Sequence, residues 1–226
     1  MDQLLSRRAL IGAGLALPLL ALPGCASLPG FNVEDAVRRL LTLSSQRAFA
    51  NLLQDEGFFQ DEVAQVTLPP ALGGTGATSV LAALLRTRAV QDQLLRVVNR
   101  AAADAAEAAA PMVMDSIRNM SIVDAIGIVR GGSTAATSYL QRSMGNAIFD
   151  AMLPGVGNAL RLLDNGIVSR ALGAATGIDF AGLQRDVALK ASDGIYRAIG
   201  REEAAIRANP QGTGDPLLSS VFGIFG

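Results

Sequence analysis

The sequence predicts an all-α fold, a single-domain multi-helix bundle preceded by a signal peptide. From Asn32 onward, apolar residues recur three and four positions apart in almost every segment, which is the spacing of one helical face. No stretch alternates apolar and polar residues over more than about four positions, as a half-buried strand would. The chain also lacks an internal repeat of about 20–50 residues, so a solenoid or a propeller is not expected.

Residues 1–24 are predicted to be a lipoprotein signal peptide. Arg7 and Arg8 precede an uncharged apolar run over residues 9–22, and a basic segment followed by an apolar one is the layout of a secretory leader. The run is shorter than the roughly 20 residues that a membrane-spanning helix needs. The arginine pair is compatible with a twin-arginine export signal and with the general secretory route, and the sequence leaves both open.

A lipid attachment site follows at Cys25, the only cysteine of the chain. The segment over residues 22–25 resembles a lipobox, in which Leu22 supplies the aliphatic position and Gly24 the small residue before the cleavage site. Cleavage there would leave Cys25 at the new N-terminus, where its thiol carries the lipid. The sequence therefore predicts that the protein is held on a membrane through an N-terminal lipid anchor.

Residues 25–31 are predicted to form a lipidated tether to the helical domain at residues 32–226. The six residues after the cysteine reach at most about 20 Å when extended, so we expect the domain to work close to the bilayer. Ala26, rather than an aspartate, follows the cysteine, and this favours the outer membrane over the inner one. The predicted location is the periplasmic side of the cell envelope.

The charge of the chain argues against a nucleic-acid partner. The formal net charge is −1, whereas a nucleic-acid-binding domain carries a basic patch or stripe. The sequence also lacks a cluster of lysines and arginines that would bind anionic lipid, so the acyl chains would have to supply the membrane attachment.

Prolines and glycines divide the helical domain into successive helices. The first begins at the capping residue Asn32, with Asp35 three positions on as in a capping box, and ends at Gly57. A long helix over residues 79–120 carries an alanine run that would let neighbouring helices approach closely, and Pro111 either starts a new turn of it or kinks it. Between these two helices we expect an extended segment at 66–70 and a glycine-rich turn at 73–76. After the long helix, a short helix begins at a Ser121–Asp124 capping box and ends at Gly131. The remaining expected elements are helices at 134–152 and 158–172 with a turn at 154–157 between them, a helix that begins after Asp179 and ends at Asn209, and a C-terminal helix at 217–225.

The residue types leave little room for common catalytic chemistry. The chain has no histidine, which removes Ser-His-Asp and Cys-His arrangements, and a lipidated Cys25 could not join a metal site. We therefore predict no catalytic residues, no metal and no cofactor. Acidic residues such as Asp104 and Glu203 lie four positions from arginines (Arg100 and Arg207), which favours ion pairs along a helix over a carboxylate active site.

Four stretches of the domain, taken in order, resemble the bacterial family known as domain of unknown function 4197. They cover residues 99–111, 121–139, 191–210 and 217–223. The resemblance implies an exported helical envelope protein, often a lipoprotein, and it implies no activity. The polar residues of these motifs form a candidate cluster, which would become a site if the fold brought them together: Asn99, Arg100, Asp124, Tyr139 and Asp193.

Two classes of function fit these observations. We favour a non-enzymatic binding or scaffold module for an apolar ligand or another envelope protein, because the domain is rich in alanine and leucine and nearly neutral. The alternative is a carboxylate-dependent hydrolase that acts on cell-wall or lipid material. An apolar groove without clustered carboxylates is the expected result. Two carboxylates about 5–10 Å apart in a polar cleft would favour the hydrolase.

Overall fold

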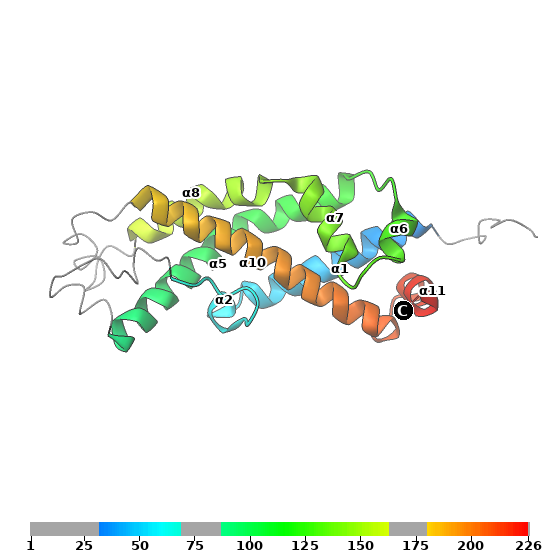
Figure 1. Cartoon of the computed structure of the whole chain (residues 1–226), viewed down its shortest axis with the longest axis horizontal. Helices are drawn as coiled ribbons and strands as arrows, with labels where there is room; N and C mark the ends of the chain where they lie inside the picture. Colours follow the sequence, from blue (N-terminus) through cyan, green and yellow to red (C-terminus); the bar gives the residue numbers. More distant parts are fainter. Residues whose placement is uncertain (1–31, 69–86, 163–179, 226) are drawn as a thin grey trace, which may run out of the picture. The chain divides into compact units, whose positions relative to one another are not determined.

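Every regular element that the structure describes is helical, which confirms the predicted fold class. The computed structural model describes residues 32–68, 87–162 and 180–225, and Figure 1 shows their arrangement. The long helices are α1 (Val33–Leu52), α5 (Arg88–Asn119), α8 (Ala147–Leu162) and α10 (Phe180–Ala208). The short elements are α2 (Gly57–Gln60), α6 (Ala125–Val129), α7 (Ala135–Met144), the 3-10 helix η2 (Pro210–Thr213) and α11 (Pro216–Phe225).

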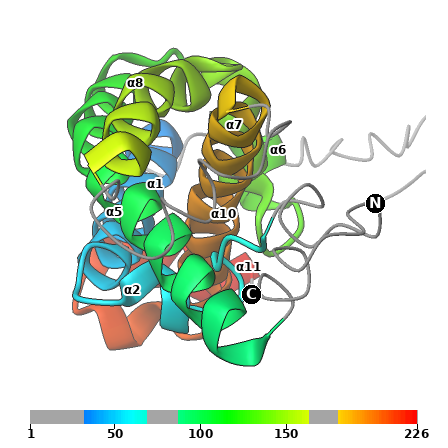
Figure 2. The same ribbon diagram turned by 90° about the vertical axis from the view of Figure 1, so that its left-hand side faces the viewer.

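Small residues hold the two most extensively packed helices, α5 and α8, close together. The alanines of α5 at 101, 102, 105, 106 and 109 are buried, as the alanine run predicts. A Cβ on Gly155 of α8 would lie 3.1 Å from the Cα and Cβ of Ala105, which leaves almost no room for a side chain. Figure 2 shows α5, α8 and α10 grouped in front of α1.

The first helix has the face and the cap that the sequence predicts. Asn32 accepts hydrogen bonds from the N–H groups of Glu34 and Asp35, and the apolar stripe from Val37 to Leu52 is buried. The helix ends at Leu52, before the expected Gly57. Gly57 instead begins α2, where a Cβ would lie only 2.4 Å from the carbonyl oxygen of Asn51.

The helix α5 continues through Pro111 from Arg88 to Asn119, and the expected new turn or kink at this proline stays a prediction. Proline cannot donate the hydrogen bond that the carbonyl of Glu107, four residues earlier, would otherwise accept. Both residues are exposed, and water can therefore satisfy that carbonyl.

The break between α7 and α8 lies earlier in the chain than the sequence predicts. The chain turns at Gly145, which has φ of +54°, a backbone conformation that favours glycine. The expected turn at 154–157 lies inside α8, where its glycines are contact points: Gly155 meets α5, and Gly157 meets Gln184 of α10. These glycines provide close helix packing and do not end the helix.

The short helix α6 is also capped later than predicted. Its N-cap is Asp124, whose carboxylate accepts a hydrogen bond from the Gly127 N–H at 2.8 Å. Ser121 does not cap it. The glycine-rich turn at 73–76, the first residues of the helix expected at 79–120, and most of the helix expected at 158–172 lie outside the described residues.

Candidate functional site

A charged cleft lies between the α1–α2 turn and α5. It has a volume of about 410 Å³ and is lined by residues 53–59 together with Arg96, Asn99, Arg100, Ala103, Asp104 and Glu107. Its four acidic residues do not match the expected apolar groove without clustered carboxylates. The sequence places two of these acids, Asp104 and Glu107, about one and two helical turns after Arg100 on α5, but only the fold brings Asp55 and Glu56 opposite them.

Arginines neutralise most of the acidic groups of this α2–α5 cleft. Arg100 binds Asp104 at 3.0 Å and Asp55 at 3.5 Å, which confirms the expected pairing along α5. Arg96 binds Glu56 and lies over the ring of Phe59, 4.4 Å from its centroid. Three of the four acidic groups of the cleft are therefore paired with arginines.

A second cleft, between α7 and α10, has a different composition. Its volume is about 460 Å³, and its walls carry Val63 from the loop after α2, Thr134, Thr137 and Ser138 at the start of α7, and residues of α10 from Asp193 to Ala204. Gly200 also lines the cleft and allows α10 to pack closely against the start of α7, because a Cβ there would lie 3.2 Å from the methyl group of Thr134.

Tyr196 is the unusual residue of the α7–α10 cleft. It is only 5% exposed, and its hydroxyl is buried without a hydrogen-bond partner. Burial, and secondarily the negative charge of Asp193 one turn earlier, raise the pKa of Tyr196 to about 12. Within the described part of the chain, the carboxylate of Asp193 has no ion pair or hydrogen bond. A buried hydroxyl and a half-buried carboxylate thus stand side by side on α10 with unused hydrogen-bonding capacity.

The loop after α2 forms one wall of this cleft, and α10 holds it in place. Arg201 donates to both carboxylate oxygens of Asp61 at 2.9 and 2.8 Å, and Arg197 donates to the carbonyl of Val63 at 2.6 Å. Burial alone would raise the pKa of Asp61, but the hydrogen bonds from Arg201 and from the N–H groups of Val63 and Ala64 outweigh it and lower that pKa.

Two residues of the family-like motifs position the same loop. Asn99 is buried; its side-chain oxygen accepts from the Val66 N–H at 2.7 Å, and its amide donates to the Val66 carbonyl at 2.9 Å. Gly194 lets the loop approach α10, because a Cβ there would lie 2.7 Å from the carbonyl oxygen of Ala64. Both residues therefore act on the backbone of the loop.

The most completely bonded acidic group is Glu203, which is fully buried. Its carboxylate accepts hydrogen bonds from the N–H groups of Ala136 and Thr137, from the Thr137 hydroxyl at 2.6 Å, and from Arg207 at 2.8 Å. The predicted ion pair with Arg207 is confirmed, but it lies in the core instead of on an exposed face. The carboxylate binds the N-terminus of α7, where the first N–H groups have no partner within the helix.

Arg207 extends this network to two further elements. It donates to the carbonyls of Ile128 and Val129 at the end of α6, both at 3.0 Å, and lies over the ring of Phe222 in α11. The network joins α6, α7, α10 and α11. The sequence indicates the pair through its four-residue spacing but not the partners on three other elements.

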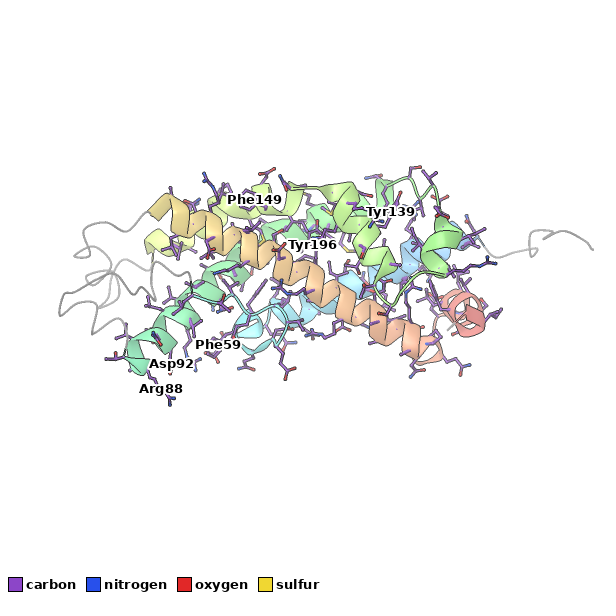
Figure 3. The ribbon with its side chains drawn as sticks, viewed as in Figure 1. Phe59, Arg88, Asp92, Tyr139, Phe149 and Tyr196 are labelled. Atoms are coloured by element: carbon purple, nitrogen blue, oxygen red, sulfur yellow. The ribbon has the colours of Figure 1, made fainter. Side chains whose placement is uncertain are left out.

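The structure distributes the five polar motif residues over separate places. Asn99 and Arg100 line the α2–α5 cleft, Asp193 lines the α7–α10 cleft, and Asp124 caps α6. The Tyr139 hydroxyl donates to the carbonyl of Ser121, which ties α7 to the segment before α6. Figure 3 shows Tyr139 on α7 and Tyr196 on α10 at different positions along the bundle. Sequence analysis missed Tyr196, although it lies three residues after Asp193 in the same motif.

The predicted leader and lipidation residues lie outside the described part of the chain. These are Arg7, Arg8, Leu22, Gly24 and Cys25. Among the described helices, none is long and apolar enough to cross a membrane. The described residues also contain no group of three or more acidic, histidine or cysteine side chains placed to hold a metal ion.

Comparison with known proteins identifies one family. No curated protein and no solved structure matches the chain. A protein-family model described as Protein of unknown function (DUF4197) matches residues 27–223, which include all four stretches that carry the resemblance. Because this match spans nearly the whole helical domain, the chain belongs to the DUF4197 family.

Proposed function

We propose that the protein is a lipid-anchored binding module of the cell envelope, held by Cys25 on the periplasmic side of the outer membrane. The observation that carries the binding role is the α7–α10 cleft, where Tyr196 and Asp193 lack partners among the described residues. Leaving a buried hydroxyl unsatisfied costs free energy, and a ligand that bonds to it would recover that cost.

The lining of this cleft indicates the chemistry of the ligand. Val63, Ala204 and the methyl group of Thr134 present apolar surface, while Asp193 can accept a hydrogen bond and Tyr196 can donate one. We expect a mainly apolar molecule that carries a hydroxyl or amide group.

A hydrolase remains the second candidate, because the α2–α5 cleft does contain clustered carboxylates. A general acid, however, is usually a carboxyl group that burial keeps protonated. Asp55, Glu56 and Asp104 are exposed and bind arginines, and Glu107 is exposed as well, so none of the four is a buried carboxyl of this kind and binding is the better supported function.

Lipidation is tested by labelling bacterial cells that express the full chain with a fatty-acid analogue. We expect the wild-type protein to carry the label and to sediment with outer membranes, and Cys25→Ser to lose both. A Cys25→Ser protein that stays on the membrane would contradict the lipid anchor.

Ligand binding is tested by mass spectrometry of organic extracts from the protein purified out of its native envelope. We expect a compound with the wild-type protein that is lost with Asp193→Ala and retained with Arg100→Ala, the matched change in the α2–α5 cleft. Loss of the compound with Arg100→Ala but not with Asp193→Ala would indicate that the ligand binds in the α2–α5 cleft instead. Release of cell-wall fragments or fatty acids by the wild-type protein would favour the hydrolase.

A further inference from the structure

Three of the five exposed large apolar side chains among the described residues lie at one end of the bundle. Val123, Ile126 and Ile224 are 88%, 58% and 69% exposed. The first two lie just before and within α6, and the third lies in α11. The helices α6 and α11 contact each other, and both contact α1. Figure 1 shows α6, α11 and the start of α1 at the same end.

The chain enters the domain at this end. Asn32 caps α1, and six residues separate it from Cys25. Whatever path residues 26–31 take, they reach at most about 20 Å. If Cys25 carries lipid, the end that contains the start of α1 is therefore the part of the domain nearest the bilayer.

The chemistry of this end suits the interfacial region of a membrane. Exposed valine and isoleucine gain free energy when they leave water for the acyl-chain boundary. Three acidic residues at this end already have partners, because Glu34 binds Arg38, Asp215 binds Arg39, and Asp124 caps α6. The exposed carboxylate of Asp35, in the first turn of α1, has no such partner among the described residues and has to stay in contact with water.

We infer that the end of the bundle formed by α6, α11 and the start of α1 rests on the lipid bilayer, with Val123, Ile126 and Ile224 inserted among the lipids. This inference depends on the proposed lipid anchor and adds an orientation to it. The start of α10, which lies at the opposite end of the bundle in Figure 1, is then far from the membrane.

The absence of tryptophan from the chain allows a direct test. Lipidated full-length protein with Ile126→Trp or Ile224→Trp is reconstituted in phosphatidylcholine vesicles, with and without brominated acyl chains. Leu189→Trp is the matched control. Leu189 is an exposed apolar residue of the same kind, and it lies 208 − 189 = 19 residues before the end of α10, a rise of about 28 Å.

We expect the fluorescence of Ile126→Trp and Ile224→Trp to shift to the blue and to fall at least twofold with brominated lipid, and that of Leu189→Trp to stay unchanged. Equal quenching at all three positions, or none at 126 and 224 while the protein is vesicle-bound, would overturn the inference. Intact mass shows separately whether Cys25 carries lipid. Failure of lipidation refutes the anchor, whereas lipidated and bound protein without quenching refutes only the orientation.

Discussion

Two regions of α10 differ in how completely their polar side chains are hydrogen-bonded. At Glu203, each carboxylate oxygen has at least two hydrogen-bond donors, and Arg207 carries the network to α6 and α11. At Asp193 and Tyr196, two to three turns earlier, a carboxylate and a buried hydroxyl have no partner among the described residues. A satisfied group of this kind stabilises the fold, whereas an unsatisfied one costs stability and is free to bind a ligand.

The largest effect is expected from breaking the satisfied region. Glu203→Ala leaves Arg207 and the N–H groups of α7 without their acceptor, and we expect a loss of about 3–5 kcal/mol in the free energy of unfolding. Urea denaturation measures it. Glu202→Ala is the control, because Glu202 has only a long 3.7 Å contact with Arg201 and should cost less than about 1 kcal/mol. Equal losses of unfolding free energy in Glu203→Ala and Glu202→Ala would contradict a stabilising role of the Glu203 network.

The second largest loss of stability is expected from replacing Asn99. Asn99→Ala removes both hydrogen bonds to the buried backbone of Val66, which should lower the free energy of unfolding by at least about 2 kcal/mol. Asn119→Ala, which removes an exposed amide bond to the carbonyl of Asp115, should cost about 0.5 kcal/mol or less. A loss of unfolding free energy in Asn99→Ala as small as that in Asn119→Ala would mean that the loop after α2 does not depend on the Asn99 side chain.

Asp61 should make stability depend on pH. Its pKa in the folded protein lies below the ordinary value of 3.8, so its contribution is complete well above pH 3.8 and is lost as the pH falls through the folded pKa. We expect Asp61→Asn to be less stable than the wild type at pH 6, and the gap to narrow as the pH falls to 3. Denaturation at both pH values measures this. A gap that stays constant or widens would show that Asp61 is not the titrating group.

The sequence predicts most of the helices because their apolar spacing and caps are local properties. The first helix and its cap at Asn32 are examples, as is the end of α10 before Asn209. The turn at 154–157 was wrong because Pro154 and the glycines at 155 and 157 are typical of turns. Their role here, close approach to Ala105 and Gln184, depends on other helices.

The candidate site is less accessible to sequence analysis for the same reason. Asn99 and Asp193 were selected as motif residues, but whether their side chains are bonded depends on a loop and on helices far along the chain. Nothing in the spacing of α10 indicates that Glu203 is satisfied and Tyr196 is not. The five motif residues could be named from the sequence, but not their separation into different regions.

The two tyrosines of the chain test the central claim most directly, because one hydroxyl is bonded and the other is not. We propose measuring the free energy of unfolding of Tyr139→Phe and Tyr196→Phe in delipidated protein, and the recovery of bound compounds from the envelope-purified forms. Tyr139→Phe should lose about 0.5–1.5 kcal/mol and keep its ligand. Tyr196→Phe should be as stable as the wild type or slightly more so, and should lose its ligand. A Tyr196→Phe protein that is clearly destabilised when empty, or that retains its ligand, would contradict the assignment of this cleft as the binding site.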